Sequence, residues 1–215
     1  MLRVSETFLS IQGESGYTGK LCFFIRLAGC NLDCSYCDTR YANEPGSGTD
    51  MSVAELVDLT VKSGSPLVEI TGGEPLLSKE LPELCAALLE QGLKVLVETN
   101  GSLPVDILPS GVIAIIDCKT PSSGHSDDMC LANFISPPAD SQVKFVIGSE
   151  EDYRFAVDFI EQYELSGKVD EILFSPVAGS ASARQLCEWM ILDKSPARMQ
   201  LQLHKYIWSP DTRGV

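Results

Sequence analysis

The chain has 215 residues, of which 44% are hydrophobic, and it contains no long polar or low-complexity tract. A chain of this size can bury one substantial core, so we expect a single domain over residues 1–215. Its formal net charge of −14 would repel a phosphate backbone, which argues against a nucleic-acid partner. The sequence has no apolar stretch near the roughly 20 residues that span a bilayer and no export signal at its start, so we expect a cytoplasmic protein without membrane contact.

Short apolar segments rich in Val, Ile, Leu and Phe recur along the chain and predict β-strands. The predicted strands are residues 21–28, 67–71, 94–98, 112–117, 142–147, 171–174 and 199–203. Amphipathic segments between them predict helices. Ser52 and Glu55 form a capping box at the start of one helix, and Gly64 is placed to end it. Two more apolar stripes, within 81–89 and 153–163, predict two further helices.

Polar motifs follow three of the predicted strands. Residues 29–38, which carry three cysteines, follow the strand 21–28; residues 72–75 follow the second strand, and Asn100-Gly101 follows the third. Strands separated by helices predict parallel β-α-β units, which form either a barrel or an open sheet. Because the carboxyl ends of parallel strands share one edge, these motifs are expected to converge there.

The most specific motif is the cluster Cys30, Cys34 and Cys37. Three thiols on one short loop can hold three corners of an iron–sulfur or zinc site and leave one metal position open. A structural zinc site completed by His125 or His204 is the alternative. The remaining cysteines do not indicate disulfides in a chain without an export signal. Four of them lie in or beside apolar runs and are predicted to be buried thiols: Cys22, Cys85, Cys118 and Cys187.

The cysteine cluster, together with Gly72-Gly73-Glu74-Pro75, resembles the radical S-adenosylmethionine superfamily. The resemblance implies an α/β fold, a shortened and partial (β/α) barrel with a mostly parallel sheet. It also implies a [4Fe-4S] cluster on the three cysteines and S-adenosylmethionine at the open iron, cleaved after reduction to a 5′-deoxyadenosyl radical. The residues implied to contact S-adenosylmethionine are Tyr36, Gly72, Gly73, Glu74, Glu98, Asn100, Asp117, Cys118, Lys119 and Lys144.

A narrower resemblance covers nearly the whole chain. Residues 10–16, 24–30, 37–39, 69–75, 98–101, 121–124, 142–145, 202–205 and 213–215 are similar to the 7-carboxy-7-deazaguanine synthase family. The resemblance implies a carbon–nitrogen lyase of queuosine and 7-deazapurine biosynthesis. Such an enzyme converts 6-carboxy-5,6,7,8-tetrahydropterin to 7-carboxy-7-deazaguanine with release of ammonia and requires Mg²⁺. It further implies a homodimer and a one-electron reductant such as flavodoxin or ferredoxin.

The same resemblance implies a substrate site. Arg26 would clamp the substrate carboxylate, Glu14 would accept from the N–H edge of the pterin, and Thr39 would bind Mg²⁺. The implied substrate contacts are Ile11, Gln12, Gly13, Glu14, Arg26, Thr71, His204 and Val215. Taken alone, Arg26 could equally form a structural ion pair, and Thr39 could equally cap a helix. No residue is assigned as a catalytic acid or base.

One departure from the family pattern is Asp117-Cys118-Lys119, which stands where many relatives have Ser-Pro-Lys. Two other functions stay open. A glycyl-radical activase would share the cluster and the Gly72-Gly73-Glu74 segment, although residues 10–16 argue against it. A zinc-stabilised binding protein is the non-enzymatic alternative.

Overall fold

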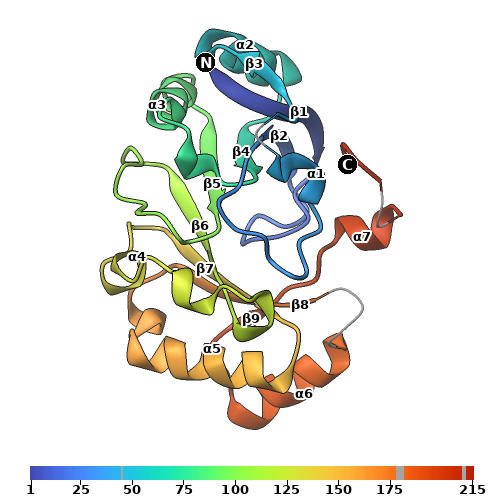
Figure 1. The fold of residues 1–215 in the computed structure, drawn as a ribbon, viewed down its shortest axis with the longest axis vertical. Coiled ribbons are helices and arrows are strands. Elements are labelled where there is room, and N and C mark those ends of the chain that lie inside the picture. The colour runs from blue at the N-terminus through green and yellow to red at the C-terminus, as the bar shows by residue number, and fades with distance from the viewer. Residues whose placement is uncertain (45, 178–181, 210–211) are drawn as a thin grey trace.

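The computed structural model describes residues 1–44, 46–177, 182–209 and 212–215 (Figure 1). The strands are β1 (Leu2–Ile11), β2 (Leu21–Leu27), β3 (Thr49–Met51), β4 (Leu67–Gly72), β5 (Lys94–Thr99), β6 (Ile113–Cys118), β7 (Gln142–Ile147), β8 (Glu171–Pro176) and β9 (Arg198–Met199). The α-helices are α1 (Arg40–Asn43), α2 (Val53–Ser63), α3 (Leu81–Glu90), α4 (Ala132–Ile135), α5 (Glu150–Gln162), α6 (Ala183–Asp193) and α7 (His204–Ile207).

One nine-stranded sheet runs through the molecule in the order β3-β1-β2-β4-β5-β6-β7-β8-β9. From β2 onward, the neighbouring strands in this order pair in parallel, whereas β1 is antiparallel to both β2 and β3. The order starts at β3 and ends at β9 without closing. The predicted α/β fold, a partial barrel with a mostly parallel sheet, is therefore confirmed.

The strand predictions are confirmed for β2 and for β4 to β8, and residues 142–147 match β7 at both ends. The prediction of a strand over 199–203 is wrong, because the last strand ends at Met199. After a final backbone hydrogen bond from Gln200 to Phe174 (2.9 Å), the chain leaves the sheet and carries Gln202 toward Glu14 (2.9 Å). In addition, β1 and β3 were not predicted.

Helices cover the outer side of the sheet (Figure 1), where α2, α3, α5 and α6 contact β2, β5, β7 and β8 respectively. The capping box of Ser52 and Glu55 is present in α2, and Gly64 ends this helix in the left-handed conformation (φ 71°). The predicted stripes at 81–89 and 153–163 lie on α3 and α5. Among the described residues, no helix combines the length and apolar character needed to cross a bilayer.

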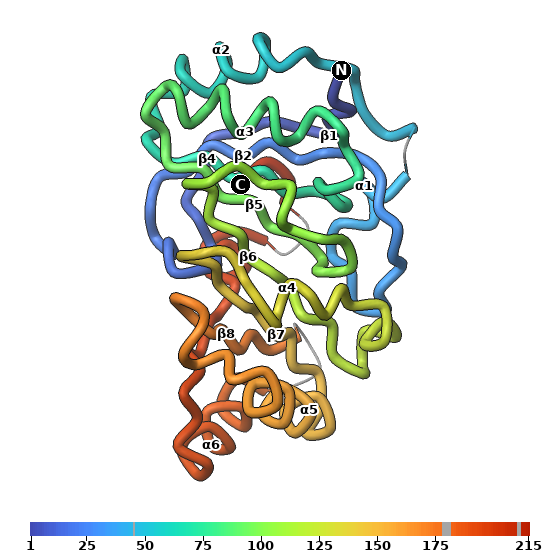
Figure 2. Tube along the Cα trace, turned by 90° about the vertical axis from the view of Figure 1, so that its left-hand side faces the viewer, coloured from blue at the N-terminus to red at the C-terminus, as the bar shows by residue number. Residues whose placement is uncertain are grey.

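The two faces of each strand have different neighbours, because successive side chains point to opposite sides of a sheet. On the outer face, residues such as Ile70, Val97 and Phe145 pack in the main core beneath the helices. Cys22, Cys85 and Cys118 are buried as predicted, whereas Cys187 is only half-buried. In the rotated view the chain descends from blue to orange, and the C-terminal end returns to the level of β2 (Figure 2).

The inner face changes from apolar to polar along each central strand. Leu67 of β4, Leu96 of β5 and Ile113 of β6 lie on this inner face and form a second apolar cluster with Phe24. Further along, the inward positions become polar and line a cavity: Glu69 and Thr71, Glu98 and Asn100, Asp117 and Lys119, and Lys144 of β7. The carboxyl ends of the strands thus form a polar floor over an apolar base.

Candidate active site

A cavity of about 680 Å³ lies at the carboxyl ends of the strands. The structure brings together here nearly all the residues that the sequence singled out, in spite of their separation along the chain. Those that line the cavity are Ile11, Gln12, Gly13, Glu14, Arg26, Cys30, Cys34, Tyr36, Cys37, Thr39, Thr71, Gly72, Gly73, Glu98, Asn100, Asp117, Lys119, Lys144, His204 and Val215. The convergence expected from a parallel sheet is therefore observed.

Two predicted cofactor contacts, Glu74 and Cys118, lie elsewhere. Cys118 is on the outer face of β6, where it is packed in the main core. The Glu74 carboxylate is buried and accepts hydrogen bonds from the Thr99 hydroxyl (2.8 Å) and from the backbone N–H groups of Asn100 (2.7 Å) and Leu76 (2.9 Å). Burial raises the pKa of Glu74, while these donors oppose the rise. Glu74 thus holds the end of β5 in place from behind the cavity wall.

The cysteine loop is packed directly against the two glycines. The backbone N–H of Gly73 donates to Leu27 (3.0 Å), and that of Glu74 donates to Gly29 (2.8 Å). A Cβ atom on Gly73 would overlap the carbonyl group of Gly29 and crowd the backbone nitrogen of Cys30. Glycine is required here because the start of the cysteine loop occupies the space of a side chain.

Two of the three thiols, Cys30 and Cys37, have N–H groups close to their sulfur atoms. Cys30 Sγ lies 3.5 Å from the backbone nitrogen of Leu32 and 3.7 Å from Asn100 Nδ2, and Cys37 Sγ lies 3.7 Å from Asn43 Nδ2. N–H groups that point at sulfur favour thiolate ligands. In the described part of the chain, no three His, Cys, Asp or Glu side chains are grouped at metal-ligand spacing. Cys30, Cys34 and Cys37 nevertheless all line one cavity, and three thiols from one short loop are the donor set that an iron–sulfur cluster takes.

The zinc alternative needs a fourth ligand, and His125 is not directed at the thiols. Its Nε2 lies 2.8 Å from Asp33 Oδ1, and its Nδ1 lies 2.7 Å from Asp128 Oδ2. Asp33 belongs to the cysteine loop, so His125 joins this loop to the segment after β6. His204 does line the cavity, next to Gly13.

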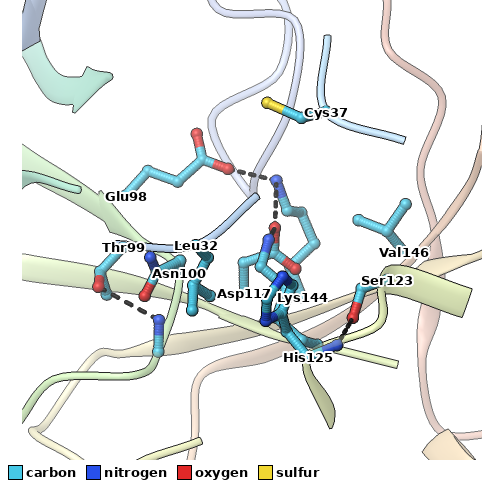
Figure 3. A network of polar contacts seen from close by, with 12 residues as sticks. Leu32, Cys37, Glu98, Thr99, Asn100, Asp117, Ser123, His125, Lys144 and Val146 are labelled. Carbon is cyan, nitrogen blue, oxygen red and sulfur yellow. Dashed lines mark hydrogen bonds and ion pairs between the residues drawn. The ribbon is translucent and has the colours of Figure 1, made fainter. Parts of the chain in front are cut away.

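The cavity floor is a network of buried charges. Figure 3 shows Lys144 between Glu98 and Asp117; its Nζ contacts Glu98 and lies 3.8 Å from Asp117 Oδ2. A third carboxylate oxygen, Glu14 Oε2, lies 3.1 Å from Lys144 Nζ. Lys119 Nζ is 2.7 Å from Asp117 Oδ2. Burial alone would lower the pKa of Lys144, but Glu14 and Glu98 hold it well above its ordinary value. Both lysines are therefore charged at neutral pH.

Comparisons with known proteins agree with this geometry. The Radical SAM superfamily domain matches residues 24–115. A 7-carboxy-7-deazaguanine synthase of Chlorobaculum tepidum is 49% identical, over all of this chain and 97% of its own. The chain belongs to the 7-carboxy-7-deazaguanine synthase family. A synthase of Koribacter versatilis is 38% identical over the full length of both chains. The crystal structure of QueE from Escherichia coli, at 24% identity, has the same fold, with a TM-score of 0.77 over 94% of each chain.

Membership in the 7-carboxy-7-deazaguanine synthase family makes the chain a radical SAM enzyme of the lyase class, for which a [4Fe-4S] cluster and S-adenosylmethionine are implied. Neither the glycyl-radical activase nor the zinc-binding alternative is favoured by these matches.

The surroundings of Arg26 include residues that the sequence did not indicate. Arg26 Nε is 2.8 Å from Glu6 Oε1, which also accepts from the Tyr41 hydroxyl at 2.7 Å. The Arg213 guanidinium lies over the Tyr41 ring, 3.9 Å from its centroid. Glu6 and Arg26 are cross-strand partners on β1 and β2. Prediction of β1 would have revealed the Glu6 contact, whereas nothing in the sequence relates Tyr41 to Arg213.

Thr39 precedes α1 but makes no side-chain capping hydrogen bond. Its hydroxyl donates instead to Asp38 Oδ1 (3.0 Å), and Asp38 Oδ2 lies 2.6 Å from Lys205 Nζ. Although burial opposes it, the neighbouring Lys205 lowers the pKa of Asp38. An ionised carboxylate and a hydroxyl are therefore side by side at the cavity wall.

Proposed function

We propose that the enzyme converts 6-carboxy-5,6,7,8-tetrahydropterin to 7-carboxy-7-deazaguanine with release of ammonia, as a cytoplasmic step toward queuosine or a related 7-deazapurine. The observation that carries this proposal is that the residues implied to hold the cofactor and those implied to bind the substrate line one cavity. The cysteine loop and Gly72-Gly73 form one side of it, and Gln12, Glu14 and Arg26 contribute to another. A cofactor and a second small molecule bound there would meet directly.

The cofactor side is formed by Cys30, Cys34 and Cys37, which would hold the [4Fe-4S] cluster. Bound S-adenosylmethionine would supply the radical that abstracts hydrogen from the substrate. The protein itself would position the bound cofactor and substrate and enclose them in the cavity. Gly73 lets the chain pass close to the cysteine loop, and Asn100 is fixed there through its backbone hydrogen bond to Glu74 (2.7 Å) and its side-chain bond to Asn31 (3.0 Å).

The substrate side offers complementary charges. Glu6 binds Arg26 through Nε, so a carboxylate would be held by the two terminal guanidinium nitrogens in a bidentate contact. The oxygens of Glu14 accept from Lys144 (3.1 Å), Gln200 (3.2 Å) and Gln202 (2.9 Å). Although burial would raise it, Lys144 and Gln202 lower the pKa of Glu14, which supports its role as an ionised acceptor for the N–H edge of a pterin.

The proposal includes Mg²⁺ at Thr39, because the Thr39 hydroxyl and the adjacent Asp38 carboxylate are oxygen donors of the kind that Mg²⁺ prefers. The metal would bind together with substrate oxygens and orient the carboxylate. A homodimer and a flavodoxin or ferredoxin as electron donor complete the proposal, on the basis of resemblance to the family.

The test is an anaerobic assay of cluster-loaded protein with S-adenosylmethionine, reductant, Mg²⁺ and the tetrahydropterin, in which the deazapurine product is followed by mass spectrometry. Arg26→Ala is expected to retain the cluster and 5′-deoxyadenosine formation but to lose product, whereas Cys34→Ala should lose both activities. Formation of 5′-deoxyadenosine without deazapurine in the unmodified enzyme would refute the proposed substrate and leave the radical chemistry standing. Equal loss of both activities in Arg26→Ala would contradict the carboxylate clamp.

A further inference from the structure

The cavity floor holds more carboxylates than cations. Glu14, Glu98 and Asp117 are each in contact with Lys144, and Asp117 is also paired with Lys119. Glu69 is different, because it takes part in no ion pair among the residues that the structure describes. Its hydrogen-bond donor is the neutral amide Nε2 of Gln12.

Glu69 is also the most enclosed of these acids, since it projects from the inward row of central strand β4 and is only 2% exposed. The groups that face it are the carboxylates of Glu98 and Glu14, the Lys144 ammonium, the Cys22 thiol and the Gln12 amide. A carboxylate buried without a cation pays its full desolvation cost, and such a group takes up a proton instead. Burial first, and then Glu98 and Glu14, raise the pKa of Glu69 well above its ordinary value, while Lys144 opposes the rise.

Glu69 ends a short chain of hydrogen bonds that starts at the turn of Gln12 and Glu14. The backbone N–H of Glu14 donates to Gln12 Oε1 (2.9 Å), and Gln12 Nε2 donates to Glu69 Oε2. Lys144 contacts both Glu14 and Glu98. A like charge nearby disfavours ionisation of a buried carboxyl group, and Glu14 and Glu98 are the two that already contact an ammonium group.

We propose that Glu69 holds a proton and, as a neutral carboxylic acid, is a positioning residue that links the turn of Gln12 and Glu14 to strand β4. Both ends of the Gln12 amide are occupied, one by the backbone N–H of Glu14 and the other by Glu69, so its orientation is fixed. The turn that carries Glu14 is fixed with it.

A consequence concerns ligand binding and rests on the proposed function. Removal of the proton from Glu69 would place a further negative charge beside Glu14 and Glu98. The Lys144 ammonium group, which holds Glu14, would then be shared with one more carboxylate. The affinity for a ligand with adjacent N–H donors, such as the pterin, is therefore expected to fall at high pH.

The proton itself can be observed by infrared difference spectroscopy of the cluster-loaded holoenzyme without substrate, because only a protonated carboxyl group has a carboxylic-acid C=O stretching band. The wild-type protein is expected to have such a band at neutral pH, and Glu69→Gln is expected to lack it. Glu83→Gln, at an exposed position of α3, is the matched control and should retain the band. Absence of the band from the wild-type protein, or its persistence in Glu69→Gln, would overturn the proposal.

The positioning role is tested by the pH dependence of binding of the tetrahydropterin to the same holoenzyme, measured by calorimetry. Glutamine imitates the neutral acid, so Glu69→Gln should bind with similar affinity at neutral pH and should lose the fall at high pH. Glu69→Asp is one methylene too short to reach Gln12, and loss of one buried hydrogen bond is expected to weaken binding about 10-fold. Equal weakening in both variants would overturn the positioning role. The infrared band without any pterin binding would support the protonated acid and refute the proposed substrate.

Discussion

Replacement of Lys144 by methionine tests whether the buried charge network stabilises the fold. The ammonium group is in contact with Glu98, 3.1 Å from Glu14 and 3.8 Å from Asp117, and the Lys144 side chain is only 7% exposed. Methionine keeps most of the side-chain volume but leaves these carboxylates without their shared cation. Removal of one member of a buried ion pair costs about 3–5 kcal/mol of unfolding free energy. For a chain of this length, that corresponds to a fall of roughly 6–20 °C in Tm.

Thermal and urea unfolding of the wild-type protein and Lys144→Met, followed by circular dichroism, measures this loss. Lys62→Met is the matched control, because Lys62 forms an exposed ion pair with Asp58 one helical turn away, and such pairs contribute only about 0.3–0.5 kcal/mol. A loss below about 1 kcal/mol in Lys144→Met would refute the view that Lys144 offsets buried negative charge.

The pH dependence of the stability difference between wild type and Lys144→Met is a second test of the charge network. Although burial opposes it, Lys144 helps to lower the pKa of Glu14, and Lys119 and Lys144 lower that of Asp117. A carboxyl group with a lowered pKa stabilises the folded state above its unfolded pKa of about 4, and this contribution is lost as the pH falls through the folded pKa. The difference between wild type and Lys144→Met should therefore shrink as the pH is lowered below about 4, through the folded pKa values of these two carboxyl groups. A difference that is unchanged over this range would contradict the electrostatic explanation.

Three other substitutions test separate parts of the site. Gly73→Ala should displace the cysteine loop, because its Cβ would overlap Gly29, and the iron content after reconstitution should fall. Gly167→Ala, at a position with open space around it, is the control and should keep the wild-type iron content. Glu74→Ala leaves three donors without their acceptor and should lower the unfolding free energy by about 1–3 kcal/mol in urea denaturation; a loss within error would show that water replaces the carboxylate. Hydrogen bonds to Asp128 and Asp33 raise the pKa of His125, so the stability that it contributes is present below its unfolded pKa of about 6.5 and is lost as the pH rises through the folded value. The difference in Tm between wild type and His125→Gln should accordingly be larger at pH 6 than at pH 9, and the opposite trend would refute this assignment.

The sequence predicted the strands that are buried on both faces, because their continuous apolar runs have no other simple interpretation. It failed for β1, in which Ser5, Glu6, Thr7 and Ser10 interrupt the apolar residues and most positions are only half-buried. The short β3 is set by pairing with β1 and has no apolar signal of its own.

For the site, motif spacing located the residues that line the cavity but could not tell on which face of a strand each would lie. The Cys118 side chain is an example, since it points outward while its neighbours Asp117 and Lys119 point inward. Contacts between residues that are far apart along the chain could not be predicted from the sequence either. Tyr41 and Arg213 are brought together only by the return of the C-terminal segment to the site.

The change from apolar to polar along the inward face of each strand has a consequence for how such an enzyme can diversify. Leu67 and Leu96 pack against other side chains, so replacing them would weaken the fold. Two residues further along each strand, Glu69 and Glu98 face the cavity, and the backbone pairing of the sheet does not depend on which side chain they carry. Ligand preference can thus be altered near the strand ends while the first half of each strand preserves foldability. A library that changes these later inward positions in charge-matched pairs, such as Glu98 with Lys144, would explore new ligands without leaving a buried charge unpaired.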